Sequence, residues 1–270
     1  MSKNKHCSYL AYLVYFSFPL CIFVIWSTSL YLFKGTRLDH LVPFRTRRVL
    51  SILLGSLEMC FAGIGFGMNA LFPIFQEIGI YGEVCNNTTA GCTEQIIIYA
   101  NAFTTVCIVP VFIGAVLGFL IDKIGLRVVH LLSTLMNFLG FLLFFFLSPS
   151  SAVIIFIGGT LSGIGGCGML VCTLSVSKLF NRTSSMIATL IQGVYDSSTA
   201  VYAFVFLTYQ AHFPFKSSLL ILAFGCLVTG ILNSLFVMSY WMEDMLKYKE
   251  SANEAIIIES DIDNFEVNYK

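Results

Sequence analysis

Long unbroken runs of apolar residues are the feature that most constrains this chain. A helix needs roughly 20 apolar residues to cross about 30 Å of hydrocarbon, and seven stretches of the sequence have about that length or more. They cover residues 9–33, 49–75, 96–121, 128–147, 152–176, 186–209 and 217–241. Backbone groups in lipid must be satisfied within their own segment, and these runs lack the alternation of a barrel strand. We therefore predict an all-α membrane protein.

Composition agrees with this prediction and excludes some partners. Hydrophobic residues make up 57% of the chain and charged residues only 11%, more apolar than a soluble core requires. The formal net charge is +0, so no global field attracts nucleic acid. The expected surroundings are the lipid bilayer, with no nucleic-acid partner.

The loops between the last six stretches alternate in charge. Basic residues gather in every second connection, and by the positive-inside rule these connections are cytoplasmic. The residues are Arg45, Arg47 and Arg48, then Lys123 and Arg127, then Lys178 and Arg182, and finally Lys247 and Lys249. The remaining connections carry little basic charge and are predicted to be external.

One predicted external loop contains two cysteines and two glycosylation sequons. Cys85 and Cys92 flank Asn86 and Asn87, each of which begins an Asn-x-Thr sequence. On the oxidising side of a membrane we expect Cys85 and Cys92 to form a disulfide, with two free thiols as the alternative. We expect glycosylation at Asn86 or Asn87, which makes the chain a glycoprotein.

The ends of the chain differ from its middle. Residues 1–45 form an N-terminal extension, whose apolar segment 9–33 is either a signal anchor or an appendage foreign to the main fold. Residues 46–244 hold the six other helices. Residues 245–270 are acidic and polar and are predicted to be a disordered cytoplasmic tail.

A short predicted cytoplasmic connection carries a glycine-and-charge motif. It contains Gly118, Asp122, Lys123, Gly125 and Arg127, and it resembles the loop signature of the major facilitator superfamily, with the last basic residue one place early. The resemblance implies a latch for the cytoplasmic gate. The alternative is an ordinary short loop with positive-inside charges.

Further segments resemble solute carrier family 43 of that superfamily. They are Leu57–Gly67 with its three glycines, Phe75-Gln-Glu77, the Cys85 and Cys92 pair, and the run from Gln192 to Val201. The resemblance covers residues 47–244 and implies the six-helix N-terminal lobe of a twelve-helix fold, with the segment 9–33 as an extra hydrophobic helix. Members of the family carry neutral amino acids or purine nucleobases, and the Tyr195–Val201 run is more similar to the nucleobase carriers.

Polar residues inside the apolar stretches are the candidate binding residues. A carboxylate within the bilayer is costly and should face protein or water, so Glu58 is either a contact for substrate or proton or an internal hydrogen-bond staple. Gln192, Tyr195, Asp196 and Thr199 recur at helical spacing. Their amide, phenol, carboxylate and hydroxyl groups suit a flat heterocycle or an amino-acid head group, with polar glue between helices as the alternative.

Small residues recur at four-residue spacing in two of the stretches. Gly114 and Gly118 form one such pair and Gly159 and Gly163 the other. Faces of this kind let helices approach closely, so we predict that they serve packing.

These observations predict a function without covalent chemistry. We expect facilitated transport of a small neutral solute across the plasma membrane by alternating access, with a purine nucleobase first and a neutral amino acid second. The chain would supply one half and would be either a fragment or a partner of a second six-helix lobe or a second copy of itself. The alternatives are a membrane adaptor or truncated regulatory isoform that transports nothing, and an enzyme embedded in the membrane. The four histidines are scattered and no catalytic motif is present, so we expect no metal, no cofactor and no enzyme activity.

Overall fold

The computed structural model describes residues 44–85, 91–180 and 183–238. The chain divides into two compact units, Met1–Leu41 and Val42–Lys270, and all described residues belong to the second. The predicted segment 9–33, the sequon residues Asn86 and Asn87, and the predicted tail 245–270 lie outside the described residues.

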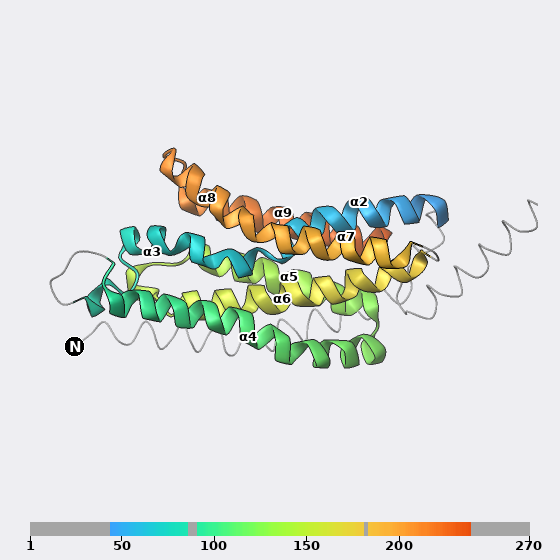
Figure 1. The fold of residues 1–270 in the computed structure, drawn as a ribbon, viewed down its shortest axis with the longest axis horizontal. Helices are drawn as coiled ribbons and strands as arrows, with labels where there is room; N and C mark the ends of the chain where they lie inside the picture. The colour runs from blue at the N-terminus through green and yellow to red at the C-terminus, as the bar shows by residue number, and fades with distance from the viewer. Residues whose placement is uncertain (1–43, 86–90, 181–182, 239–270) are drawn as a thin grey trace, which may run out of the picture. The chain divides into compact units, whose positions relative to one another are not determined.

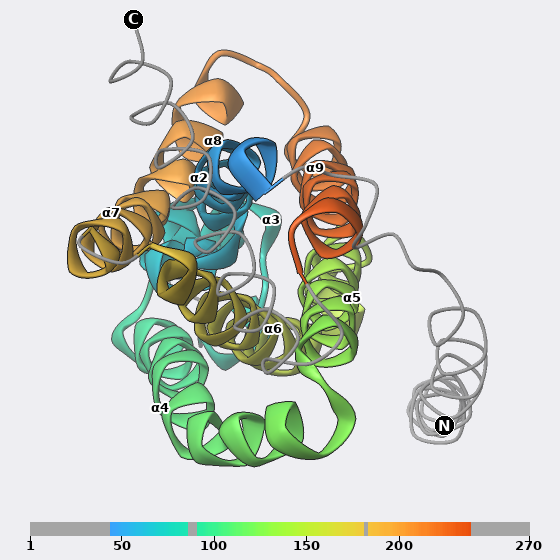
Figure 2. The same cartoon turned by 90° about the vertical axis from the view of Figure 1, so that its right-hand side faces the viewer.

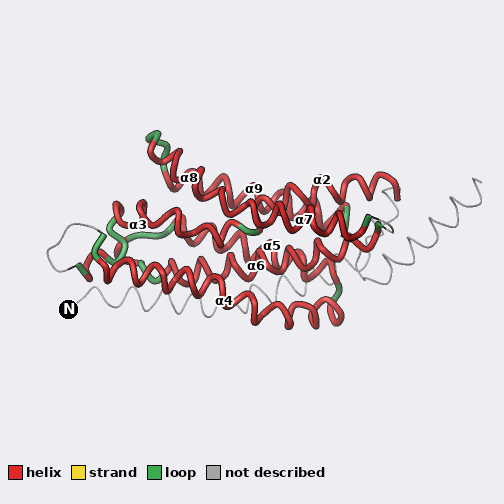
Figure 3. The backbone as a smooth tube through the Cα atoms, viewed as in Figure 1, coloured by secondary structure: helices red, strands yellow, loops and turns green. Residues whose placement is uncertain are grey.

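In the described part of the chain, six helical segments are long and apolar enough to cross a membrane. They are Thr46–Ile78, Thr93–Ile124, Leu126–Phe145, Ile154–Leu179, Ser184–Gln210 and Phe215–Phe236. They coincide with the last six predicted stretches, and the described part of the chain contains helices and loops but no strand (Figure 3). The prediction of an all-α, multi-pass membrane protein is confirmed.

Four of the spans are continuous α-helices and two are interrupted. The continuous ones are α4 (Thr93–Ile124), α5 (Leu126–Phe145), α6 (Ile154–Val176) and α9 (Phe215–Phe236). The first span consists of α2 (Phe44–Ala62), the 3-10 helix η2 (Ile64–Leu71) and α3 (Phe72–Ile78). The fifth consists of α7 (Ser184–Ser197), the 3-10 turn η6 (Ser198–Ala200) and α8 (Val201–Gln210) (Figure 1). A 3-10 stretch in the middle of a helix often marks a hinge or a strained segment.

The packing of the spans repeats after three helices. The second span, α4, packs against the fourth, α6, just as α7 and α8 of the fifth span pack against the first. The third span contacts the fourth as the sixth contacts the first, and α5 and α9 contact each other (Figure 2). Two three-helix repeats related by a two-fold axis produce this pattern.

Glycines permit the closest of these helix contacts. A Cβ at Gly159 or Gly163 of α6 would lie 2.6 Å from a Val106 methyl group or 2.8 Å from the Val106 carbonyl oxygen of α4. This face therefore serves packing, as small-residue faces in membranes do. Gly114 and Gly118 differ, because a Cβ at either would meet no described atom within 4 Å.

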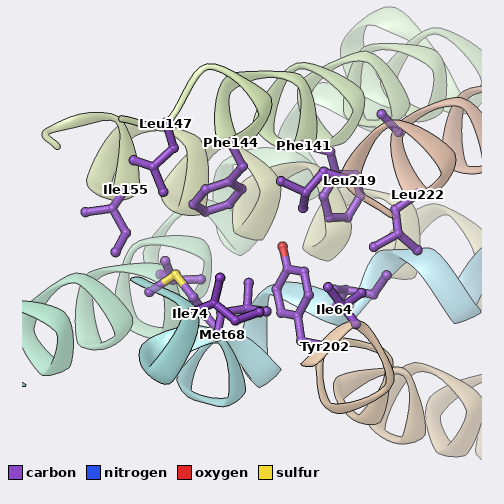
Figure 4. Close-up of a cluster of buried hydrophobic side chains, with 14 of the residues drawn as sticks. Ile64, Met68, Ile74, Phe141, Phe144, Leu147, Ile155, Tyr202, Leu219 and Leu222 are labelled. Carbon is purple, nitrogen blue, oxygen red and sulfur yellow. The ribbon is translucent and has the colours of Figure 1, made fainter. Parts of the chain in front are cut away.

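The main apolar cluster draws buried side chains from all six described spans. Figure 4 shows Tyr202 of α8 reaching from the side of Ile64 and Met68 toward Phe144 and Leu219. Its side chain is fully buried, and its hydroxyl has no hydrogen-bond partner among the described residues. This cluster holds the two interrupted spans against the rest of the bundle.

Candidate functional site

The interruptions of the first and fifth spans lie against each other. η2 packs on η6 and on α8, and the contact is between backbones. A Cβ at Gly63 would overlap the Tyr195 carbonyl oxygen, and a Cβ at Gly67 would overlap that of Thr199. The two glycines and the two carbonyls each recur after four residues, so they meet as matching rows.

Local chemistry explains why both spans are interrupted at this level. Gly63, Gly65 and Gly67 weaken the α-helix, since glycine is less favourable than alanine by about 1 kcal/mol per residue. In the fifth span three consecutive hydroxyls bond back to the main chain: Ser197 to the Val194 carbonyl at 2.9 Å, Ser198 to that of Tyr195 at 2.7 Å and Thr199 to that of Asp196 at 2.9 Å. Such back-bonding competes with the helical ladder and bends it.

An aromatic pair spans the junction of the two interruptions. The ring centroids of Phe66 and Tyr195 are 5.9 Å apart at an interplanar angle of 65°, an edge-to-face contact. Tyr195 is only 6% exposed and Phe66 is half-buried. Residues i and i+3 of a 3-10 helix eclipse each other, so the exposed Asn69 follows Phe66 on the same side of η2.

The structure brings Gln192 and Asp196 together and separates them from Tyr195. The Gln192 amide donates to the Asp196 carboxylate at 3.0 Å, and Asp196 is exposed near the middle of the fifth span. Tyr195, the preceding residue, turns inward, and the Thr199 hydroxyl is used by the backbone. Among the four predicted binding residues, Gln192 and Asp196 present an exposed polar pair on the described part of the chain.

A shallow hollow of about 520 Å³ runs along α7. It is mostly apolar and is lined by Met186, Thr189, Leu190, Gly193, Val194 and Ser197. The hollow lies on the same helix as Gln192 and Asp196. This stretch of α7 therefore offers an apolar surface and a polar pair side by side.

Glu58 lies apart from this region, in a contact between three spans. His130 Nε2 of α5 is 2.8 Å from Glu58 Oε1 and is hydrogen-bonded to Oε2 at 3.1 Å. The Asn233 amide of α9 also donates to Oε2, and all three side chains are fully buried. Glu58 thus staples helices in this structure, whereas its contact with substrate or proton stays a prediction.

His130 and Asn233 were missed from the sequence, where the histidines look scattered. The signal was available, because both are polar residues inside apolar stretches, where burial requires a partner. Nothing in the spacing assigns them to Glu58, which is separated from His130 by 72 residues and from Asn233 by 175. No cluster of three or more potential metal ligands occurs among the described residues.

Two arginines fasten the end of the sixth span. Arg127 donates from Nε at 2.9 Å and from Nη2 at 2.6 Å to the Met238 carbonyl, and Arg47 donates from Nε at 3.0 Å to that of Val237. Both guanidinium groups are buried. Cations at a helix C-terminus satisfy its free carbonyls and favour its dipole. The α9 helix therefore ends where α2 and α5 begin.

The predicted gate loop has a mixed environment. Gly125 has φ +95°, a conformation that favours glycine, and it allows the direct turn from α4 into α5. Asp122 and Lys123 are exposed at the end of α4, and Gly118 has open space around it. Of the charged residues, Arg127 makes the buried contact. The latch itself stays a prediction.

The predicted external end of the bundle is tied by a disulfide and a buried amide. Cys85 and Cys92 are bonded, with their Cα atoms 5.8 Å apart. The Gln95 amide donates to the Ile80 carbonyl at 2.7 Å and accepts from the Gly91 amide at 3.0 Å. Tyr81 is half-buried in the same loop, and burial raises the pKa of its hydroxyl.

Curated proteins resemble this chain, among them one from Bos taurus and one from Saccharomyces cerevisiae. The Equilibrative nucleobase transporter 1 of Bos taurus is 28% identical over 192 residues, which are 67% of this chain and 39% of the relative. Protein FMP42 of Saccharomyces cerevisiae is 28% identical over 178 residues, 63% of this chain and 35% of the relative. The chain thus matches less than half the length of either protein. The sequence matches no protein-family profile.

These relatives support part of the predicted resemblance, namely the likeness to membrane transporters. A transporter named for nucleobases is among the proteins similar to this chain, and both matches cover most of the chain and include membrane spans. Membership of the major facilitator superfamily and of solute carrier family 43 stays a prediction. What the relatives do as whole proteins concerns this chain only as a proposal.

Proposed function

We propose that this chain forms one lobe of a membrane carrier that moves a small neutral solute by facilitated diffusion, and that the solute is a purine nucleobase. The observation that carries the proposal is the junction of two interrupted spans. In membrane carriers, discontinuous helices commonly form the solute site near the midplane, where unwound backbone and polar groups can reach the ligand. The pairing of η2 with η6 supplies such a junction.

The side chains around the junction suit a flat heterocycle. Phe66, which is half-buried and packs edge-to-face on the buried Tyr195, supplies aromatic surface, and aromatic rings favour offset or edge-to-face contact with other rings. The Gln192 and Asp196 pair supplies donors and acceptors for the edge of a base, and Asn69 adds a second amide. The nucleobase name of the Bos taurus relative supports the choice of substrate. No cofactor or covalent chemistry is required.

The exposure of Asp196 supports a second lobe. A carboxylate facing lipid at mid-span costs about 2.5–3.5 kcal/mol on insertion scales, so protein or a water-filled cavity must lie beside it. The relatives are more than twice as long as the segments that match this chain. We propose that another six-helix body, from a second lobe or a second copy, encloses the cavity at the plasma membrane.

Direct binding tests the proposal. The purified full chain in lipid nanodiscs is titrated with tritiated adenine and, in parallel, with tritiated leucine. We expect saturable adenine binding that falls at least tenfold in Asp196→Asn, since loss of one charge-assisted hydrogen bond costs about 1.5–3 kcal/mol. The matched control is Glu94→Gln, at an exposed residue in the first turn of α4, and it should leave adenine binding unchanged.

Other outcomes would contradict the proposal in different ways. Leucine binding without adenine binding would replace the nucleobase with a neutral amino acid. Binding of neither solute, together with absence of uptake into cells that express the chain, would refute the carrier. Capture of a partner protein that is lost on removal of residues 245–270 would then indicate an adaptor.

A further inference from the structure

A buried acid–base pair outside the junction is unused by the proposed solute site. Glu58 and His130 are both 0% exposed, and the imidazole Nε2 lies 2.8 Å from one carboxylate oxygen. Asn233 binds the same carboxylate from α9. His130 is in the second turn of α5 and Asn233 in the last turn of α9, so the contact lies near the predicted cytoplasmic ends of these spans.

The second imidazole nitrogen is available for a proton. His130 Nδ1 is buried and has no hydrogen-bond partner among the described residues. Nε2–H can donate to Glu58 whether or not Nδ1 is protonated, so a proton can join or leave Nδ1 without breaking that bond. With the proton the pair is neutral, and without it the buried pair carries one negative charge.

The surroundings contain little else that could neutralise Glu58. The titratable groups that face it are His130 from α5, Cys172 from α6 and Cys226 from α9. Neither buried thiol supplies a positive charge.

Charged side chains on and around α2 make contacts elsewhere: Arg48 of α2 lies over the Phe180 ring and Lys216 of α9 lies over the Phe145 ring. Arg47 and Arg127 donate to main-chain carbonyls at the end of α9. On α7, Tyr195 packs against Gly63 and Phe66, and Asp196 is exposed and bonded to Gln192. An uncompensated charge in such a site costs several kcal/mol, which favours the pair that holds one proton.

We propose that Glu58 and His130 form a proton-binding site that holds one proton while α2, the first two turns of α5 and the last turn of α9 are packed together, and that releases it when they separate. As a step of a transport cycle the site rests on the proposed function. As a proton-dependent contact between helices it does not, and it can be tested without any solute.

The size of the effect follows from counting protons. In water an imidazole titrates near pH 6.5 and a carboxyl group near pH 4.3, so a separated pair holds about 0.1 proton at pH 7.5 and about one at pH 5.5. The proposal requires the packed pair to hold one proton at both pH values. Packing therefore takes up a proton at pH 7.5 and almost none at pH 5.5, which favours the packed form about tenfold more at pH 5.5.

Amide hydrogen exchange of the full chain in nanodiscs tests this proposal. Peptides covering residues 126–137 of α5 and 226–238 of α9 are followed by mass spectrometry at pH 5.5 and 7.5, with rates corrected for the intrinsic pH dependence of exchange. We expect protection about tenfold higher at pH 5.5. The double variant Glu58→Gln/His130→Gln keeps amide groups at both positions but binds no proton, so its protection should not depend on pH.

The controls separate a proton site from a structural contact. His212→Asn alters an exposed histidine between α8 and α9 at φ +64°, a conformation that Asn tolerates, and it should behave as the wild type does. If the double variant fails to fold by circular dichroism, Glu58→Gln serves instead: its packed His130 has no carboxylate to hold a proton, whereas a separated imidazole binds one at pH 5.5, so protection should then be higher at pH 7.5.

The outcomes distinguish this proposal from the proposed function. Wild-type protection that is independent of pH, or protection that is still higher at pH 5.5 in the folded variant, would leave the pair as a structural contact only and overturn the proposal. A chain that binds no adenine but shows the expected exchange behaviour would refute the solute and keep the proton site.

Discussion

Replacing Gly67 with alanine tests whether the junction of the two interrupted spans depends on direct backbone contact. The new Cβ would overlap the Thr199 carbonyl oxygen and would lie 2.9 Å from its carbon and 3.2 Å from the Thr199 Cα. These are all backbone atoms, so no side chain can rotate out of the way, and η2 or η6 must shift. Overpacking of this kind costs about 1–3 kcal/mol, offset by the roughly 1 kcal/mol that alanine gains over glycine in a helix.

We expect Gly67→Ala to be about 1–3 kcal/mol less stable than Gly114→Ala, because both variants gain the alanine preference and only Gly67→Ala meets backbone atoms. Thermal unfolding in detergent, followed by far-ultraviolet circular dichroism, measures it, since 1 kcal/mol shifts the midpoint by about 2–4 °C in a chain of this size. Gly114→Ala is the matched control, because its Cβ meets no described atom within 4 Å and it should be as stable as the wild type or more so. Equal midpoints for Gly67→Ala and Gly114→Ala, with adenine binding unchanged, would refute the backbone contact.

Two further variants test the ends of the bundle. Arg127→Lys cannot reproduce the two hydrogen bonds to the Met238 carbonyl, so we expect the free energy of unfolding to fall by about 1–3 kcal/mol. Amide hydrogen exchange should become faster only at the end of α9. An equal increase in exchange rate throughout the chain would contradict this local role. Cys85→Ser opens the disulfide with Cys92, whose sequence separation of 7 corresponds to about 2.5 kcal/mol of chain entropy. A reducing agent should then lower the unfolding midpoint of the wild type and leave that of Cys85→Ser unchanged.

The spans were predictable because membrane helices are specified by local composition. Each of the six described spans has enough consecutive apolar residues to be recognised from the sequence alone, without knowledge of the helices that it contacts. The interruptions were harder to see. Gly63, Gly65 and Gly67 are apolar by hydropathy, and the hydroxyls of Ser197, Ser198 and Thr199 can satisfy themselves within a helix. Only their mutual contact shows that the two segments belong together.

Side-chain direction explains what the sequence could not supply for the site. Helical spacing put Gln192, Tyr195, Asp196 and Thr199 near one face, but successive residues point about 100° apart on a helix of 3.6 residues per turn. Packing on Phe66 and Gly63 turns Tyr195 inward and leaves Asp196 exposed. The partners of Glu58 come from distant segments, and no short-range pattern identifies such contacts.

The first span connects the two polar regions of the molecule. Glu58 lies toward the C-terminal end of α2. The residue that follows this helix is Gly63, which contacts the Tyr195 carbonyl of the fifth span. Between these residues the helix is continuous to Ala62, and a continuous helix moves as one rigid element. A shift of the fifth span that accompanies solute binding would press on Gly63 and move Glu58 relative to His130 and Asn233. Because interfaces of this kind have discrete arrangements and do not deform continuously, occupation of the junction and proton release at the buried pair would be linked through α2.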